Sequence, residues 1–200
     1  MNSLKPLLHK FIGKTHNGFV LGRKILDAAI TMHEVLHSME KSGNPSMALK
    51  LNISKAYDRI NWTFLYKIME RIGLSQNVIR MVKSMVETVS YSVMVNGSSW
   101  GNFGGERGLR QGDPISPYLF IMVVEVLGRA FKRNLEGGII KGIKIASTLP
   151  LEVIQQFLDD TFLSGESSVG EARAWKLVLQ IYAMNARQKI NFDKRKIVLL

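Results

Sequence analysis

Two adjacent aspartates, Asp159 and Asp160, are the residues of this chain whose type and setting most clearly indicate chemistry. They interrupt a short apolar run, from Phe157 to Leu163, in which an unpaired negative charge would be costly. A segment that reverses direction at this pair would form a β-hairpin with both acids at its tip. Because the natural partner of two such carboxylates is a divalent cation, the sequence predicts a cation-binding hairpin here.

A second informative stretch runs from Gly108 to Pro117 and leads directly into an apolar, helix-like segment. Gly108 and Gly112 permit a close backbone approach, and the two prolines of the stretch fix its path. Arg110 and Gln111 offer hydrogen-bond donors to a nucleotide or a template strand. Taken alone, the same pattern also suits a plain turn at the entry of a helix.

Composition favours a polyanionic partner. The chain carries 27 basic and 16 acidic residues, a net charge of +11, which indicates nucleic acid, although scattered lysines alone could produce it. The absence of cysteine excludes disulfides and cysteine-based zinc sites. The longest apolar run, Tyr118 to Leu127, is short and contains Glu125, and the first fourteen residues lack the apolar stretch of a signal peptide. We therefore expect a soluble intracellular protein with no membrane partner.

These residues must be positioned by helices and strands that the pattern also predicts. Apolar spacing and terminal signals predict helices over Ile25–Lys41, Trp62–Ile72 with Asn61 as the cap, Gln76–Glu87, Pro117–Leu135 and Gly170–Ala186. Alternation and turn signals predict strands over Met47–Asn52, Tyr91–Val95 and Ser99–Phe103 around Asn96-Gly97, Ile139–Ile145, Glu152–Ser164, and one starting at Ile197. Helices interleaved with hairpins predict an α+β fold, with the helices against one face of an antiparallel sheet.

Five segments together resemble the reverse transcriptase (RNA-directed DNA polymerase) of LINE-type, non-LTR retrotransposons, particularly those of plants. They are Gly18–Arg23 (GFVLGR), Leu49–Asp58 (LKLNISKAYD), Arg107–Phe120 (RGLRQGDPISPYLF), Phe157–Thr161 (FLDDT) and Gln188–Lys194 (QKINFDK). The resemblance covers nearly the whole chain and implies a right-hand polymerase palm with part of the fingers and no thumb. Residues 1–46 would be partial fingers and a connecting helix, and residues 47–200 the palm with an inserted fingers-side hairpin.

The resemblance also implies an activity and its participants. In the family, two Mg²⁺ or Mn²⁺ ions, held by the hairpin acids and one further Asp, join a dNTP to a DNA primer on an RNA template. By position, Asp159 and Asp160 are the metal-binding pair, and Tyr57 excludes a ribose 2′ hydroxyl. Action in the nucleus is expected from the family alone, since the sequence contains no clear targeting signal. The remaining expected contacts are Arg110, Gln111 and Gly112 on the nucleotide and template, Arg23 on the triphosphate, and Lys194 as the acid for the leaving pyrophosphate.

Asn52 departs from the family pattern. In the family this position, five before the aromatic residue, holds the metal-bridging Asp, whereas the amide here carries no charge. A carboxylate and a divalent ion attract by roughly 8 kcal/mol at 4 Å and an effective dielectric constant near 20, before desolvation is subtracted. Asp58 lies past the turn, and because the family keeps an Asp there as well, we interpret it as structural. The hypothesis is a truncated, degenerate domain with weakened metal binding and impaired catalysis.

Other interpretations stay open. The domain could be a non-catalytic nucleic-acid-binding remnant, or an unstable fragment of a retroelement gene. Tyr57 also suits a core aromatic position, and Arg23 and Lys194 also suit solvated surface. His33 and His37 lie four residues apart but lack a third ligand nearby, so we interpret them as ordinary helix residues.

Overall fold

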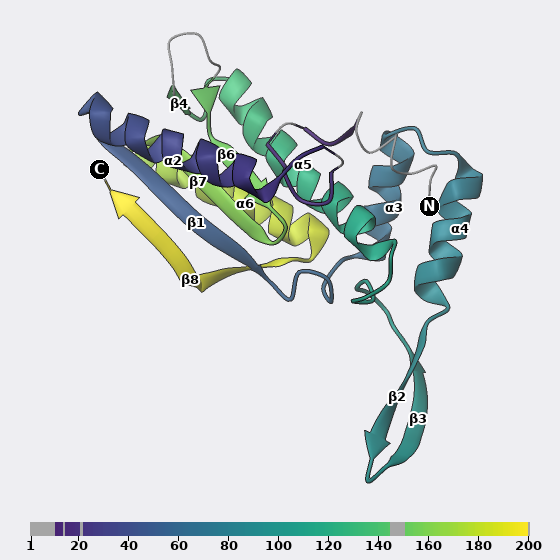
Figure 1. Cartoon of the computed structure of the whole chain (residues 1–200). Helices are drawn as coiled ribbons and strands as arrows, with labels where there is room; N and C mark the ends of the chain where they lie inside the picture. Colours follow the sequence, from purple (N-terminus) through teal and green to yellow (C-terminus); the bar gives the residue numbers. More distant parts are fainter. Residues whose placement is uncertain (1–10, 14, 21, 145–150, 200) are drawn as a thin grey trace.

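The centre of the molecule is a four-stranded antiparallel sheet with the strand order β6-β7-β1-β8 (Figure 1). The structure is a computed structural model that describes residues 11–13, 15–20, 22–144 and 151–199. Its strands are β1 (Ser46–Ser54), β6 (Ile154–Phe157), β7 (Asp160–Glu166) and β8 (Lys189–Leu199). The helices are α2 (Ile25–Ser42), α3 (Trp62–Arg71), α4 (Gln76–Glu87), α5 (Ser116–Glu136) and α6 (Val169–Ala186). The α+β class is therefore confirmed.

Local signals explain where several elements begin and end. The Asn61 side chain accepts hydrogen bonds from the backbone N–H groups of Thr63 and Phe64 and so caps α3. Gly43 ends α2 in the left-handed conformation, with φ at 63°. Asn96 and Gly97 both have positive φ in the turn between β2 (Ser90–Val95) and β3 (Ser98–Gly104), as a tight hairpin turn requires.

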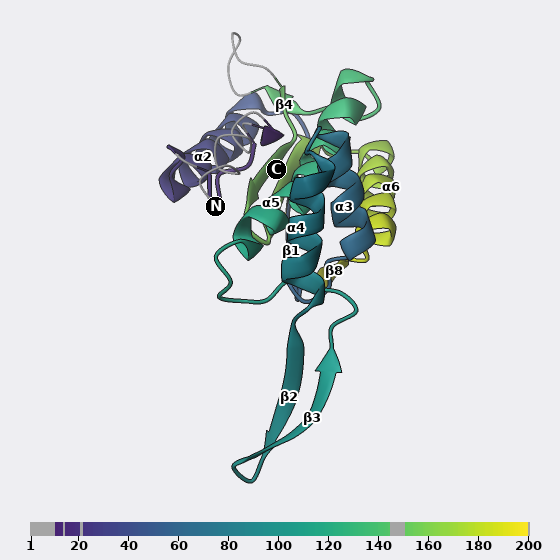
Figure 2. The same ribbon diagram turned by 90° about the vertical axis from the view of Figure 1, so that its right-hand side faces the viewer.

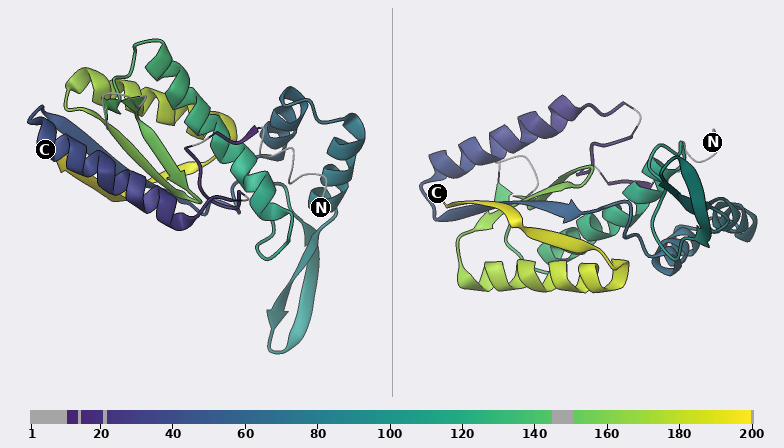
Figure 3. Two further views of the ribbon diagram at one scale, coloured as in Figure 1. Left: turned by 45° about the horizontal axis from the view of Figure 1, so that its top comes forward. Right: turned by 90° about the horizontal axis from the view of Figure 1, so that it is seen from below.

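The two faces of the sheet pack against different helices. Odd-numbered residues of β1, such as Leu51 and Ile53, belong to the main core, which includes the buried faces of α3, α5 and α6. Ala48 points to the opposite face and packs in a smaller cluster with Val35 and Met39 of α2. Figure 3 shows α2 on one side of the sheet and α6 on the other. The expectation that all helices lie against one face is therefore wrong for α2, because both faces of β1 carry apolar side chains to cover.

Two of the predicted strands differ most from the strands of the structure. The strand expected over Ile139–Ile145 is reduced, within the described residues, to β4 (Ile143–Lys144), which pairs with β5 (Leu151–Glu152). The last strand begins at Lys189 and not at Ile197, because β8 pairs along β1 from Ser54 back to Met47. Tertiary pairing thus extends a segment whose own sequence is rich in lysine and polar residues.

The hairpin of β2 and β3 extends away from the sheet and the helices (Figures 1 and 2). Every residue of both strands is exposed. No helix in the described ranges is long and apolar enough to cross a bilayer.

Candidate active site

The two aspartates lie at the turn between β6 and β7, at the end of the sheet where β1 also ends its pairing with β7. Leu158 has a positive φ of 54°, and Asp160 is the first residue of β7, paired with Phe157 across the turn. The backbone N–H of Ile53 donates to the Asp159 carbonyl at 3.0 Å, which fastens the turn to β1. The predicted hairpin is confirmed, with one acid in the turn and the other beginning the return strand.

Asn52 lies directly opposite Asp160 in the pairing of β1 with β7. Its side-chain amide nitrogen donates to Asp159 Oδ2 at 2.7 Å and to Asp160 Oδ1 at 3.3 Å. The structure therefore brings together the three residues that the sequence singled out, but the residue at position 52 is a hydrogen-bond donor to the two acids. Hydrogen bonds to charged acceptors are stronger than those between neutral groups.

A lysine completes this group. Lys50 precedes Asn52 by two residues and so points to the same face of β1, and its Nζ lies 2.8 Å from Asp160 Oδ2. Both carboxylate oxygens of Asp160 thus have N–H donors. Sequence reasoning missed Lys50, although the two-residue period of the strand placed it beside Asn52.

This donor set does not fit a pair of divalent cations as it stands. Hard cations are bound by oxygen ligands, commonly carboxylates. Within the described ranges, no group of three or more His, Asp or Glu side chains could hold a metal ion. The two acids that are present, Asp159 and Asp160, accept hydrogen bonds from an amide and an ammonium group.

Tyr57 lies close to this group. Its ring stacks on Phe120 of α5, with the ring centroids 4.8 Å apart. Burial, followed by the negative charge of Asp159, raises the pKa of the Tyr57 phenol, so its hydroxyl stays protonated at neutral pH. The tyrosine is partly buried.

The loop from Gly108 to Pro117 is attached by hydrogen bonds to the turn that contains Tyr57. Leu109 donates its backbone N–H to the Tyr57 carbonyl at 2.9 Å, and Gly108 donates to the Ile60 carbonyl at 2.8 Å. Gly108 has a φ of 91°, and a Cβ at this position would lie 2.7 Å from the Asp58 carbonyl oxygen. Only glycine fits such a contact without movement of the backbone.

The residues expected to contact a nucleotide follow this anchored point. Arg110, Gln111 and Gly112 are all exposed to solvent. The indole N–H of Trp62 donates to the Gly108 carbonyl at 2.6 Å and adds a further tie between the loop and α3. The loop therefore presents its donors from a firmly attached base next to Tyr57.

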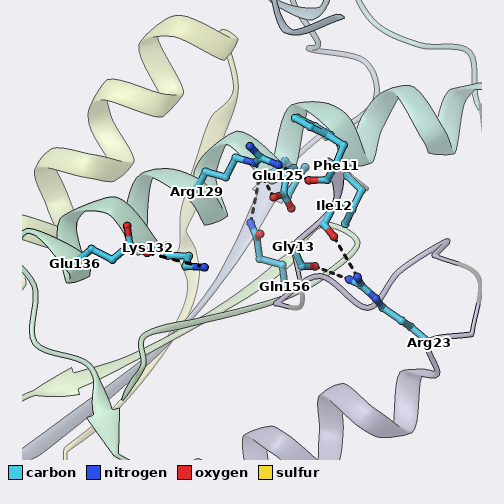
Figure 4. A network of polar contacts seen from close by, with 10 residues as sticks. Phe11, Ile12, Gly13, Arg23, Glu125, Arg129, Lys132, Glu136 and Gln156 are labelled. Carbon is cyan, nitrogen blue, oxygen red and sulfur yellow. Dashed lines mark hydrogen bonds and ion pairs between the residues drawn. The ribbon is translucent and has the colours of Figure 1, made fainter. Parts of the chain in front are cut away.

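Arg23 donates hydrogen bonds to three backbone carbonyls of the segment that precedes it. Its guanidinium donates to the Ile12 carbonyl at 3.1 Å and to the Gly13 carbonyl (Figure 4), and also to the His16 carbonyl. These contacts fold the segment before α2 back on itself, and none of them involves the hairpin acids. Lys194 lies in β8, and its side chain is outside the described residues.

Sequence reasoning also missed a buried polar group that holds the N-terminal segment against α5 and β6. Gln156 of β6 donates its backbone N–H to the Thr15 carbonyl at 2.8 Å and its side-chain amide to the Val124 carbonyl at 3.3 Å. His16 is fully buried, and burial, followed by the charge of Arg23, lowers its pKa to about 4. Burial raises the pKa of Glu125 although Arg129 lies 2.9 Å away (Figure 4). The positions carry no sequence signal of their contact, since they are far apart in the chain.

Solved structures with a similar fold include two telomerases. The chain superposes on an apo telomerase from Candida tropicalis, truncated from its C-terminal domain, with a TM-score of 0.70 and 16% identity, covering 100% of this chain and 40% of that one. A telomerase from Candida albicans, in complex with a fragment of telomeric RNA, gives a TM-score of 0.71 at 14% identity over 98% of this chain and 33% of that one. At these identities the likeness concerns the fold alone.

Similar sequences occur in transposable elements. A transposon TX1 protein of Xenopus laevis, described as an uncharacterized 149 kDa protein, is 25% identical over 191 residues, covering 96% of this chain and 14% of its own length. The Pol polyprotein of the R2DM element of Drosophila melanogaster is 27% identical over 155 residues, covering 76% of this chain and 14% of its own length. The chain thus spans about one seventh of these relatives. The model of the family described as reverse transcriptase (RNA-dependent DNA polymerase) matches residues 1–199, and the chain therefore belongs to the reverse transcriptase family and is related to the enzymes of non-LTR retrotransposons.

Proposed function

We propose that this chain is the palm, with part of the fingers, of a LINE-type reverse transcriptase, and that it binds template, primer and dNTP but is impaired in catalysis. Residues 1–46 would belong to the fingers and the connecting helix, and residues 47–200 to the palm. The hairpin of β2 and β3 would be a fingers-side insertion. Reverse transcriptases use divalent metal ions, so the proposal concerns how well this copy can hold them.

One observation carries the proposal: the Asn52 amide donates to both hairpin carboxylates, at 2.7 and 3.3 Å. A third carboxylate at this position would instead add a negative charge to the same group. Rotation of the amide would offer one neutral oxygen, which attracts a cation far less than the roughly 8 kcal/mol of a carboxylate at 4 Å. Mg²⁺ or Mn²⁺ binding should therefore be weak at Asp159 and Asp160.

The other residues support substrate binding. Tyr57 is partly buried and feels the charge of Asp159, a position suited to contact with the sugar of an incoming nucleotide. Arg110 and Gln111 offer exposed donors from a loop that is tied to the Tyr57 turn. The net charge of +11 favours a nucleic-acid duplex. We further propose Lys194 as the group that neutralises the leaving pyrophosphate.

Primer extension on an RNA template, with Mg²⁺ or Mn²⁺, tests the proposal. We expect little or no extension by the natural sequence and a gain of activity in Asn52→Asp. The double variant Asn52→Asp/Asp159→Asn is a matched control, because it restores one acid and removes another, and it should stay inactive. Robust extension by the natural sequence would contradict the proposal.

A second candidate function is nucleic-acid binding without nucleotide incorporation, which the basic charge favours. Binding through phosphate contacts weakens steeply with salt. A filter-binding assay on an RNA–DNA hybrid should then give the same steep salt dependence for the natural sequence and for Asn52→Asp. If the natural sequence binds the hybrid without extending a primer, and Asn52→Asp also gains no primer extension, this second function is the better description.

A further inference from the structure

Lys50 and Asp160 form an ion pair inside the group of side chains, Asn52, Asp159 and Asp160, for which the resemblance to the family implies cation binding. The pair joins Lys50 Nζ to Asp160 Oδ2 at 2.8 Å, and the side chains are 46% and 40% exposed. Across the strands Lys50 lies opposite Phe162, and Asp160 lies opposite Asn52, so the lysine reaches its diagonal neighbour. The contact is a product of the β1–β7 register and needs no change in the backbone.

We propose that Lys50 is a built-in counter-ion, whose ammonium group competes with divalent cations for the Asp160 carboxylate. The inference rests on the proposed function in one respect, namely that the hairpin acids are the cation-binding groups. It goes beyond that function because it assigns part of the weak cation binding to a residue other than Asn52. Two positions on the same face of β1, Lys50 and Asn52, then act on the same two acids.

The charges of this group support the proposal. Asp159 and Asp160 contribute two negative charges, and the positive charge of Lys50 offsets one of them. Asn52 adds hydrogen bonds but no charge. A divalent cation approaching Asp160 therefore meets a carboxylate that already has a positive partner.

The surroundings of the ion pair make such competition possible. A solvent-open cavity of about 150 Å³ lies between α2 and this face of the sheet, and both Lys50 and Asp160 line it. A small hydrated ion can therefore reach the Asp160 carboxylate. Ala28, Ala29 and Met32 of α2 supply the opposite wall, which carries no charge to hold the lysine elsewhere. The ammonium group contacts Asp160 at 2.8 Å.

The expected effect follows from the exposure of the pair. Because a partly exposed ion pair contributes about 0.2–1 kcal/mol, its removal should tighten cation binding by about 1.4- to fivefold at 1.4 kcal/mol per factor of ten. Lys50→Gln keeps a hydrogen-bond donor and removes the charge, whereas Lys50→Met removes both. Similar gains in the two variants would assign the effect to the charge.

Lys141→Met is the matched control. Lys141 pairs with Glu166 at 2.7 Å, also on β7 and also exposed. Glu166 lies six residues from Asp160, about 20 Å along the strand. The control therefore removes the same net charge and the same kind of ion pair from the same strand, away from the hairpin acids.

The experiment is a Mn²⁺ titration by calorimetry, combined with thermal melts with and without Mn²⁺, on the whole chain. Both Lys50 variants should bind Mn²⁺ about 1.4- to fivefold more tightly than the natural sequence and show a larger Mn²⁺-induced rise in melting temperature. Lys141→Met should match the natural sequence. Equal affinity in the Lys50 variants and the natural sequence, or an equal gain in Lys141→Met, would overturn the proposal.

The same comparison in the Asn52→Asp background separates the two proposals. Cation binding should be stronger, and easier to measure, in Asn52→Asp. If Lys50→Gln/Asn52→Asp binds Mn²⁺ more tightly than Asn52→Asp alone, the counter-ion role of Lys50 holds in this background as well. No difference between these two variants overturns it. If Asn52→Asp itself gains no affinity while Lys50→Gln does, the explanation based on Asn52 fails and the role of Lys50 stands.

Discussion

Asn52→Asp should destabilise the protein in the absence of metal, although it introduces the acid that the resemblance to the family implies at this position. The change replaces two N–H···O contacts, at 2.7 and 3.3 Å, by contacts between carboxylates. Each lost hydrogen bond to a charged acceptor is worth about 1.5–3 kcal/mol, and like charges 4 Å apart repel by about 1 kcal/mol in water and about 4 kcal/mol at a dielectric constant of 20. Because the Asp160 side chain is 40% exposed and the side chains can separate, we expect a loss of about 2–4 kcal/mol in the free energy of unfolding at pH 7.

The assay is urea unfolding in EDTA, followed by the same measurement with Mn²⁺. Repulsion raises the pKa of the introduced carboxyl group, so the loss should shrink as the pH is lowered and that group is protonated. Mn²⁺ should also reverse the loss, because a ligand that binds only the folded state stabilises it. Asn52→Ala removes the hydrogen bonds without adding charge and should cost less than Asn52→Asp. If Asn52→Asp unfolds in EDTA at pH 7 with the stability of the natural sequence, our description of the Asn52 contacts is wrong.

Three further predictions concern stability. Burial lowers the pKa of His16 to about 4 in the folded state, against an ordinary value of 6.5. Its contribution to the free energy of unfolding is therefore fully present above pH 6.5 and is lost as the pH falls toward 4, with a loss of about 2 kcal/mol by pH 5. Urea unfolding of His16→Gln should lack this part of the pH dependence. Gly108→Ala should lower the melting temperature more than Gly112→Ala, because both have positive φ but only at Gly108 would a Cβ press on the Asp58 carbonyl; equal effects would contradict this account. Asn61→Ala should cost about 1 kcal/mol in chemical unfolding through loss of the α3 cap, and an unchanged midpoint would show that the cap is dispensable.

Elements with strong local signals could be predicted from the sequence. The helix Gln76–Glu87 has the same bounds in the prediction and the structure, because Ser75 caps it and its apolar positions repeat at helical spacing. The turn at Asn96 and Gly97 needs positive φ at both residues, which this pair adopts readily. The hairpin that carries Asp159 was predictable because charged residues interrupt an apolar run.

Features that depend on tertiary contacts could not be predicted. The apolar stripe of α2 shows that one side of the helix is covered, but not which face of the sheet covers it. The start of β8 at Lys189 depends on pairing with β1, which extends the strand through polar residues. Asn52 was recognised as a missing charge, while its role as a donor to Asp159 and the approach of Lys50 to Asp160 appear only when the register of β1 and β7 is known.

The three carbonyl contacts of Arg23 have a consequence for how degenerate copies of such elements are interpreted. Because its guanidinium fastens the segment from Ile12 to His16, natural selection for a folded product would retain this arginine after polymerase activity had disappeared. Lysine could not substitute well, since a single ammonium group lacks the planar fork that reaches several oxygens at once. Arg23 therefore has a structural reason to be kept that does not depend on polymerase activity.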